Sequence, residues 1–292
     1  MYGNSRKIIG GSLGAAVGHV ELPYQSRHPK DSMVNRSSNS GRPAILAAAL
    51  DLDGTVIGPD ENISPAVHEA IVRLAALIPV FIATGREPAD VLRYSKELGL
   101  TTPQLCDGGA NILDPVREVS TWTAPLGPAN AELVVTRLRE IGSAFVATHA
   151  NGTASTFDDV PGWDLIRVSA LDMDEATADA LANEFSGNKD MYVIKAVLPY
   201  NGLWAIDFTL AGVDKASGIS RVGDTLGVAP ANMVAVGDSY NDLPMLEVCG
   251  FSVAMGNAPP EVRAAADFVA PSVEEDGLAV AINEYVLPRL IG

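Results

Sequence analysis

The stretch LDLDGT at residues 50–55 ends the apolar run AILAAAL at 44–50 and places two carboxylates two positions apart. A continuous apolar run of this length is typical of a strand that is buried on both faces of a parallel sheet. Residues i and i+2 of an extended chain point to the same side, so Asp51 and Asp53 are expected to project together from the carboxyl end of the strand. Open α/β sheets bind ligands at this end. The alternative is a solvated Asp-rich turn, but two close carboxylates are costly unless a proton or a cation lies between them.

The flanking sequence alternates strand and helix patterns. Ser64 and Pro65 form a typical helix start, PVFIATG at 79–85 is a second apolar strand, and residues 87–99 have helical spacing. The alternation resumes near Lys215, with a buried strand at 232–238, a short helix at 242–250, edge strands at 251–257 and 267–272 and an amphipathic helix at 276–290. We therefore predict an α/β fold whose core is a Rossmann-like parallel sheet.

The alternation lapses over residues 112–210. Mixed polar and apolar strands are expected at 118–124, 143–149, 191–199 and 203–211, and helices at 128–142 and 174–185. This pattern predicts an α+β cap at 112–210, inserted into a catalytic core formed by 43–111 and 211–292. Residues 1–42 have a linker-like composition and are predicted to be a disordered extension. A signal peptide, a transit peptide and a misassigned start codon remain alternatives for this segment.

Charge and composition limit the classes of function. The net charge is −16, and because residues 1–42 carry +4, the remainder carries −20. An acidic body argues against a nucleic-acid surface, and a phosphorylated substrate would need local cations such as a metal ion. No apolar run reaches the ~18 residues of a membrane span. Two cysteines, Cys106 and Cys249, suit the core of a cytoplasmic protein better than a disulfide framework.

Polar residues also follow the other predicted strands. The second strand ends in Thr84 and Gly85, and the strand at 232–238 runs into Asp238, Ser239, Asn241 and Asp242. Lys215 opens the return to the core. Because the carboxyl ends of parallel strands share one edge of a sheet, these groups are expected to gather around Asp51.

These four motifs, DLDGT, ATGR, Lys215 with Gly218 and GDSYNDLPML, resemble those of the haloacid dehalogenase superfamily, specifically its Cof-like branch of sugar-phosphate phosphatases. The tail VAMGNA and AADFVAPSVEEDG fits the same branch, and the likeness covers about residues 44–292. The resemblance implies a hydrolase with a cap that closes over the site and selects the substrate.

The resemblance also implies roles for individual residues. Asp51 would be the nucleophile, and Asp53 the general acid and then the base. Thr84, Gly85, Lys215 and Asn241 would bind the phosphoryl group. Magnesium would be held by Asp51, the backbone carbonyl of Asp53 and Asp238, with Asp242 as a further ligand or as a support for the ligands.

Structural alternatives exist for several of these residues. Thr84 could cap the following helix, and Lys215 could be a surface lysine. Asn241 and Asn257 could be turn residues, and Arg86 could be a surface charge or pair with an acid. The chain departs from the branch at Gly108, where many members have asparagine; Asp107 or Asn111 could compensate for the lost polar contact.

The cap offers only weak candidates for substrate contacts. They are Lys195, Trp163, Tyr192, Trp204, His149 and Asn151, each with an alternative as a core or surface residue. The predicted function is a cytoplasmic, Mg²⁺-dependent phosphomonoesterase acting on a small metabolite, with sugar phosphates first and phosphoglycolate next. The alternatives are a phosphotransferase or mutase with the same aspartyl-phosphate, or a non-catalytic phospho-ligand binding module. The sequence does not indicate the oligomeric state.

Overall fold

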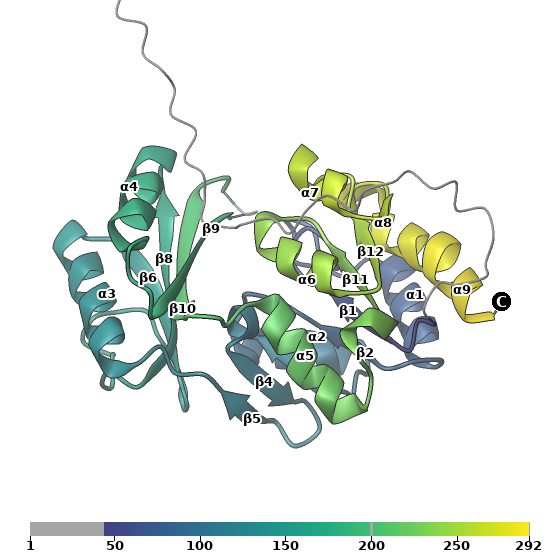
Figure 1. Ribbon diagram of the computed structural model, residues 1–292, viewed down its shortest axis with the longest axis horizontal. Helices are drawn as coiled ribbons and strands as arrows, with labels where there is room; N and C mark the ends of the chain where they lie inside the picture. The colour runs from purple at the N-terminus through teal and green to yellow at the C-terminus, as the bar shows by residue number, and fades with distance from the viewer. Residues whose placement is uncertain (1–43, 199–200, 292) are drawn as a thin grey trace, which may run out of the picture. The chain divides into compact units, whose positions relative to one another are not determined.

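The computed structural model describes residues 44–198 and 201–291, and the predicted extension at 1–42 lies outside them. A parallel sheet forms the centre of the described chain, as predicted (Figure 1). Its strands, in spatial order, are β13 (Phe268–Val269), β12 (Phe251–Ala254), β11 (Met233–Gly237), β1 (Ala47–Leu50) and β2 (Val80–Ile82). The Rossmann-like character of the core is therefore confirmed.

Helices cover both faces of this sheet. Successive strand residues face opposite sides, so β1 directs Ala48 and Leu50 to one face and Ala47 and Ala49 to the other. The first face packs against α1 (Pro65–Ala75), α2 (Pro88–Glu97) and the C-terminal segments α8 (Gly277–Val280), η5 (Ala281–Val286) and α9 (Leu287–Ile291). The second packs against α5 (Lys215–Leu226), α6 (Leu243–Val248) and α7 (Pro260–Ala265). The helix expected at 276–290 is present, but its middle section, η5, is a π-helix.

A second, antiparallel sheet is built from residues 144–210, between β5 and α5 in the sequence. Its strands, in spatial order, are β7 (Gly152–Ala154), β6 (Ala144–His149), β8 (Leu165–Met173), β10 (Trp204–Leu210) and β9 (Met191–Val197). Helices α3 (Pro128–Ile141) and α4 (Glu175–Phe185) cover one face with apolar side chains (Figure 1). The sequence patterns did not identify β8, the middle strand, although its apolar residues at 166, 168 and 170 alternate with polar residues at 167 and 169.

A third sheet differs from the expectation. Its strands are β3 (Gln104–Cys106), β4 (Asn111–Asp114) and β5 (Val119–Thr123), so the strand expected at 118–124 pairs with β4 and not with the antiparallel sheet. Ile112 and Leu113 pack among the residues of the central sheet. The division into a core at 43–111 and 211–292 and a cap at 112–210 stays a prediction. Short helical turns complete the described chain: η1 (Asp107–Gly109), η2 (Pro230–Asn232), η3 (Tyr240–Asp242) and η4 (Val273–Glu275).

Within the described ranges, no helix combines the length and the apolar character needed to cross a membrane. Both cysteines are buried and free. Burial raises the pKa of the Cys249 thiol to about 12 and raises that of Cys106 as well. The cysteines therefore act as small core residues, as expected from their number.

Candidate active site

The site lies where three neighbouring parallel strands end. Leu50, the last residue of β1, is paired with Val236 of β11 and Ile82 of β2. The next residues of each strand therefore emerge side by side, and the Asp51 N–H still donates to the Val236 carbonyl over 2.9 Å. This register gathers Asp51, Asp238 and Thr84 at one edge of the sheet, as the sequence patterns predicted.

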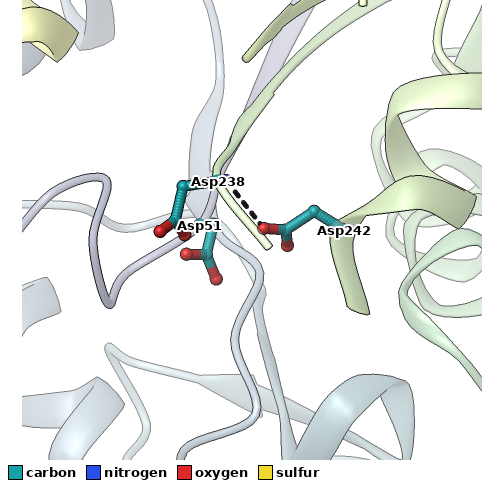
Figure 2. Close-up of side chains that lie close together, drawn as sticks. All are labelled: Asp51, Asp238 and Asp242. Carbon is teal, nitrogen blue, oxygen red and sulfur yellow. Dashed lines mark hydrogen bonds between the residues drawn. The ribbon is translucent and has the colours of Figure 1, made fainter. Parts of the chain in front are cut away.

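Three carboxylates converge at this edge (Figure 2). Asp51, Asp238 and Asp242 each offer an oxygen within 4.8 Å of the others, and Asp51 and Asp242 are almost completely buried. The N–H groups of Asp238 and Ser239 each donate to Asp242 Oδ2 over 2.9 Å. Asp242 thus holds the turn after β11 in place, while its other oxygen, Oδ1, accepts from Lys215 Nζ over 2.5 Å.

One buried cation partly balances these charges. Lys215 is the first residue of α5, whose start is set by the capping side chain of Asp214. Its Nζ lies 2.6 Å from Asp51 Oδ1 and 2.5 Å from Asp242 Oδ1, and the residue is 1% exposed. The alternative of a surface lysine is therefore wrong.

Two glycines permit this close assembly. Gly218 of α5 lies so near Leu105 that an added Cβ would be 2.4 Å from its Cδ1, so the glycine lets the N-terminal turn of α5 reach the sheet. Gly54 has a φ of +77°, and a Cβ there would lie 2.2 Å from Asp238 Oδ2. The glycine of DLDGT is thus required by the Asp238 carboxylate, and Gly218 by the close packing of α5 against Leu105.

Burial makes the charges of the cluster costly. Burial, together with the nearby Asp242 carboxylate, raises the pKa of Asp51 to about 7, although Lys215 opposes the shift. Burial and the Asp51 and Asp242 charges raise the pKa of Asp238 well above its ordinary range. For Lys215, burial alone would lower the pKa, but Asp242 and Asp51 outweigh it and raise the pKa.

The donor set fits a divalent cation. One lysine faces three carboxylates, and Asp238 Oδ1 is buried without a hydrogen-bond partner in the described chain. Such an oxygen needs a donor or a cation, and carboxylate oxygens are the ligands that Mg²⁺ prefers. The Asp238 Oδ2 atom is already engaged, because it accepts from Asn257 Nδ2 over 2.8 Å.

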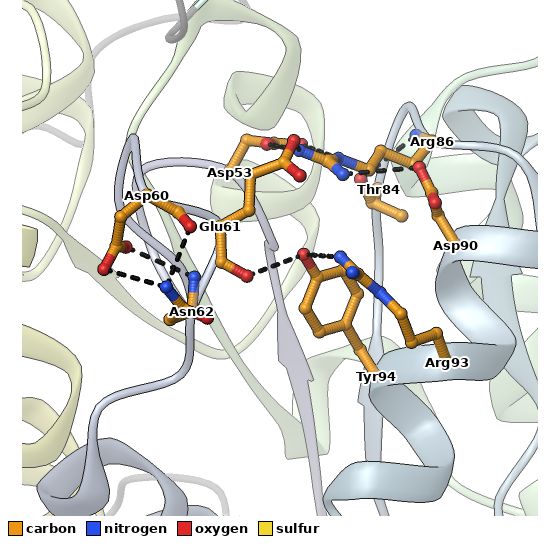
Figure 3. Close-up of polar contacts among 9 residues, drawn as sticks. All are labelled: Asp53, Asp60, Glu61, Asn62, Thr84, Arg86, Asp90, Arg93 and Tyr94. Carbon is orange, nitrogen blue, oxygen red and sulfur yellow. Dashed lines mark hydrogen bonds and ion pairs between the residues drawn. The ribbon is translucent and has the colours of Figure 1, made fainter.

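Asp53 lies apart from this cluster and is paired with Arg86 (Figure 3). Arg86 Nε lies 2.9 Å from Asp53 Oδ2, and Nη2 lies 2.7 Å from Oδ1. The same guanidinium contacts Glu61 and Asp90. Pairing with an acid, one of the alternatives raised for Arg86, is therefore confirmed, and the predicted general acid is held as an ion pair.

Three of the predicted phosphate ligands, Gly85, Lys215 and Asn241, line one pocket, and Thr84 is not among its lining residues. Thr84 is buried, and its hydroxyl accepts from the Arg86 N–H over 3.1 Å, whereas the helix cap of α2 is Glu87. The capping alternative for Thr84 is therefore wrong. Asn257 is more than a turn residue, because it also donates to the Gly54 carbonyl over 3.0 Å.

The residues considered for substrate contact face different surroundings, and on β9 the alternation of side chains separates Tyr192 from Lys195. Tyr192 of β9 lines the pocket, whereas Lys195 faces α4, where its Nζ lies 2.5 Å from Asp179 Oδ1 and 3.9 Å from the centre of the Trp204 ring. Trp163 and Trp204 pack against the core of the antiparallel sheet. His149 lines a separate hollow, and its Nδ1 accepts from the Asn151 N–H.

A second charged network was missed by sequence reasoning. The buried Asp107 of η1 accepts from Thr148, Asn111 and Arg167, and Arg167 Nη1 lies 2.9 Å from Asp207 Oδ1. The sequence patterns suggest Asp107 only as a replacement for the asparagine that is missing at position 108. The signal in the sequence is Arg167, a charged residue within the alternating stretch at 166–170 that forms part of β8.

Comparisons with known proteins agree with this geometry. The haloacid dehalogenase-like hydrolase family matches residues 48–185 and 153–282. The chain is 31% identical to the phosphoglycolate phosphatase of Natronomonas pharaonis over 240 residues, which is 82% of this chain and 97% of that protein. It is 30% identical to the 5-amino-6-(5-phospho-D-ribitylamino)uracil phosphatase YitU of Bacillus subtilis over 267 residues, covering 81% and 96%.

A solved structure of a haloacid dehalogenase-like hydrolase from B. subtilis has the same fold, with a TM-score of 0.73 at 20% identity over 82% of this chain and all of that one. The chain belongs to the haloacid dehalogenase-like hydrolase family. The assignment to the phosphatases of this superfamily, made from four short motifs, is thereby confirmed.

Proposed function

We propose that the protein is a Mg²⁺-dependent phosphomonoester hydrolase that acts on a small phosphorylated metabolite through an aspartyl-phosphate at Asp51. The observation that carries the proposal is the position of Asp51, buried beside two further carboxylates and held by Lys215. A bound Mg²⁺ would be held by Asp51, Asp238, Asp242 and the Asp53 carbonyl, and it would offset the negative charge of the phosphoryl group.

The chain's own residues account for the two steps. Asp51 attacks phosphorus, the bond to the leaving-group oxygen breaks, and that oxygen takes a proton from Asp53. A water then attacks the aspartyl-phosphate, Asp53 takes its proton, and phosphate departs with Asp51 regenerated. Because an ion-paired carboxylate is a poor acid, Asp53 has to leave Arg86 before it donates a proton.

The remaining residues bind the phosphoryl group. The Thr84 hydroxyl, the Gly85 backbone and the Asn241 amide donate to its oxygens, and Lys215 keeps Asp51 oriented for attack. We propose that the antiparallel sheet acts as the cap, because β9 contacts η3 at the edge of the site. Closure of such a cap excludes water from the aspartyl-phosphate.

The substrate class is left open by the relatives, since one is named for phosphoglycolate and the other for a ribitylaminouracil phosphate. We retain sugar phosphates as the first group to test. The cytoplasmic location also stays a prediction.

The test is phosphate release from a panel of phosphorylated metabolites with Mg²⁺ or with chelator. Wild type is compared with Asp51→Asn and with Asp158→Asn, an exposed acid of the antiparallel sheet's loops as a control. We expect release that requires the metal, falls on the order of 10⁴-fold in Asp51→Asn and is unchanged in the control. Turnover by Asp51→Asn near the wild-type rate would refute the nucleophile, and no release from any compound would favour phosphotransfer or a binding module.

A further inference from the structure

The pocket above Lys215 has a second wall, formed by the antiparallel sheet. Tyr192 and Ile194 of β9 and Asp207 and Thr209 of β10 line it, opposite Gly85 and Lys215. The β9 side chains at 192 and 194 point into the pocket because alternate residues of a strand share one face. Since the phosphoryl group belongs beside Lys215 and Asp51, this wall faces the leaving group.

Asp207 is the charged group of β10 on this wall, and its orientation is set from behind. Its Oδ1 accepts from Arg167 Nη1 over 2.9 Å and from the Ser169 hydroxyl. Arg167 is itself buried and held by Asp107 at 3.2 Å. The other oxygen, Oδ2, lies 3.9 Å from where a Cβ on Gly85 would be, so it faces the phosphate-binding loop.

The pocket offers no free positive charge to a ligand. Among its lining residues in the described chain, Lys215 is the cation, and two carboxylates already hold it. Arg167 is shared between Asp107 and Asp207. The pocket also contains the Asp214 carboxylate, whose charge, after burial, is the second influence that raises the pKa of the Tyr192 hydroxyl to about 12. The hydroxyl of Tyr192 therefore stays protonated as a hydrogen-bond donor.

We infer that Asp207 is a specificity-determining residue that accepts a hydrogen bond from a hydroxyl of the leaving group and excludes leaving groups that carry a carboxylate. Arg167 is the positioning residue that aims the Asp207 carboxylate. This inference rests on the proposed function for the location of the phosphoryl group. This role of Asp207 favours substrates whose leaving group is an uncharged polyol. It disfavours phosphoglycolate, the substrate named for one relative. A like charge without a counterion is costly in a partly buried pocket.

The test uses two ligands that differ in one group. sn-Glycerol 3-phosphate ends in a hydroxymethyl group where 3-phospho-L-glycerate has a carboxylate, and the two share the configuration of the central carbon. Their dissociation constants are measured by calorimetry with Mg²⁺ on the full chain carrying Asp51→Asn, so that binding is separated from turnover. We expect glycerol 3-phosphate to bind at least ~10-fold more tightly.

Second substitutions on the same background locate the selectivity. Asp207→Asn should bring the two constants within ~3-fold, because the amide can donate to a carboxylate. Asp158→Asn should leave the preference intact. For Arg167, we expect Arg167→Gln to weaken glycerol 3-phosphate binding and Arg167→Lys to restore part of it, with inorganic phosphate binding unchanged in both.

Three results would overturn the inference: equal or reversed affinities, a preference that survives Asp207→Asn, or no binding of either ligand. If selective binding is found but the wild type releases no phosphate from any compound, the hydrolase proposal fails and the role of Asp207 stands.

Discussion

Two charge networks reach the same pocket, one through Lys215 and the other through Asp207, and they are balanced differently. In the first network, Lys215 is the cation beside the Asp51 and Asp242 carboxylates, and Asp238 Oδ1 is buried with no hydrogen-bond partner in the described chain. In the second, Arg167 is placed between Asp107 and Asp207, and Thr148, Asn111 and Ser169 supply further hydrogen bonds. Asn111 Oδ1 is also buried without a partner in the described chain, so the two networks differ in charge: three carboxylates share one lysine in the first, and two carboxylates share one arginine in the second.

The difference indicates where external charge binds. An under-compensated cluster is stable only if a cation or protons join it, which suits a metal and a phosphoryl group. A cluster whose members satisfy one another can orient a side chain without binding an ion. The contrast therefore distinguishes the proposed catalytic centre around Asp51 from the proposed specificity-determining side of the pocket around Asp207.

The strongest test of this contrast removes each cation. Lys215→Met and Arg167→Met should each lower the free energy of unfolding in chelator by ~3–5 kcal/mol, because each leaves buried carboxylates without their partner. The measurement is urea unfolding at neutral pH.

Mg²⁺ should distinguish the two variants. In Lys215→Met, Mg²⁺ should restore much of the lost free energy of unfolding, because the carboxylates can hold a cation. In Arg167→Met, Mg²⁺ should add no more stability than it adds to the wild type. Equal recovery in both variants would show that the second network also binds the metal.

Substitution of Asp53 tests whether chemistry and metal binding are separate. Asp53→Asn should slow turnover of alkyl phosphates by ~10²–10⁴-fold, the usual contribution of a general acid. Its Mg²⁺ affinity, read by calorimetry, should stay within ~3-fold of wild type, since its carboxylate lies outside the acidic cluster. A large loss of affinity would place the carboxylate on the metal.

Metal binding should depend on pH in a definite direction. The pKa of Asp51 is raised to about 7, so below that pH Mg²⁺ has to displace a proton and its apparent affinity should fall by up to ~10-fold per unit. At neutral pH, Mg²⁺ at ~100 times its dissociation constant should add ~2.7 kcal/mol of stability.

In the metal-free protein, the contribution of Asp51 to stability should change with pH in the opposite direction. The folded-state pKa of Asp51 lies above its ordinary value of 3.8, so this group's contribution to stability decreases as the pH rises from about 4 to about 7. Thermal unfolding across this range, with and without Mg²⁺, tests both signs. Asp238→Asn should weaken both trends.

The smallest effect is expected at η1, which contains Asp107 of the second network. Gly108 has a φ of +65° and no atom within 4 Å of an added Cβ, so Gly108→Asn, the residue common in the Cof-like branch, should change stability by less than ~1 kcal/mol. Gly109→Asn is the contrasting variant, because its Cβ would lie 2.1 Å from the Asp214 carbonyl oxygen. Similar losses in both would show that the loop, and not the close contact, limits substitution.

Much of the first network could be predicted from the sequence. Apolar runs that end in Asp51, Thr84 and Asp238 give both the strands and the edge where they meet, because parallel strands share an orientation. Lys215 needed the resemblance to a family, since a single lysine carries no local signal. Even so, the patterns did not reveal that Asp53 pairs with Arg86, a contact between side chains 33 residues apart.

The second network could not be predicted in this way. Asp107, Arg167 and Asp207 come from three elements, and each looks like an ordinary surface charge in its own segment. The sequence by itself determined the parallel core and the carboxylates at its edge, because local periodicity encodes burial and strand direction. Only the tertiary structure decided which charges meet and which oxygen of Asp207 faces the pocket, because pairing between distant strands leaves no periodic trace in the chain.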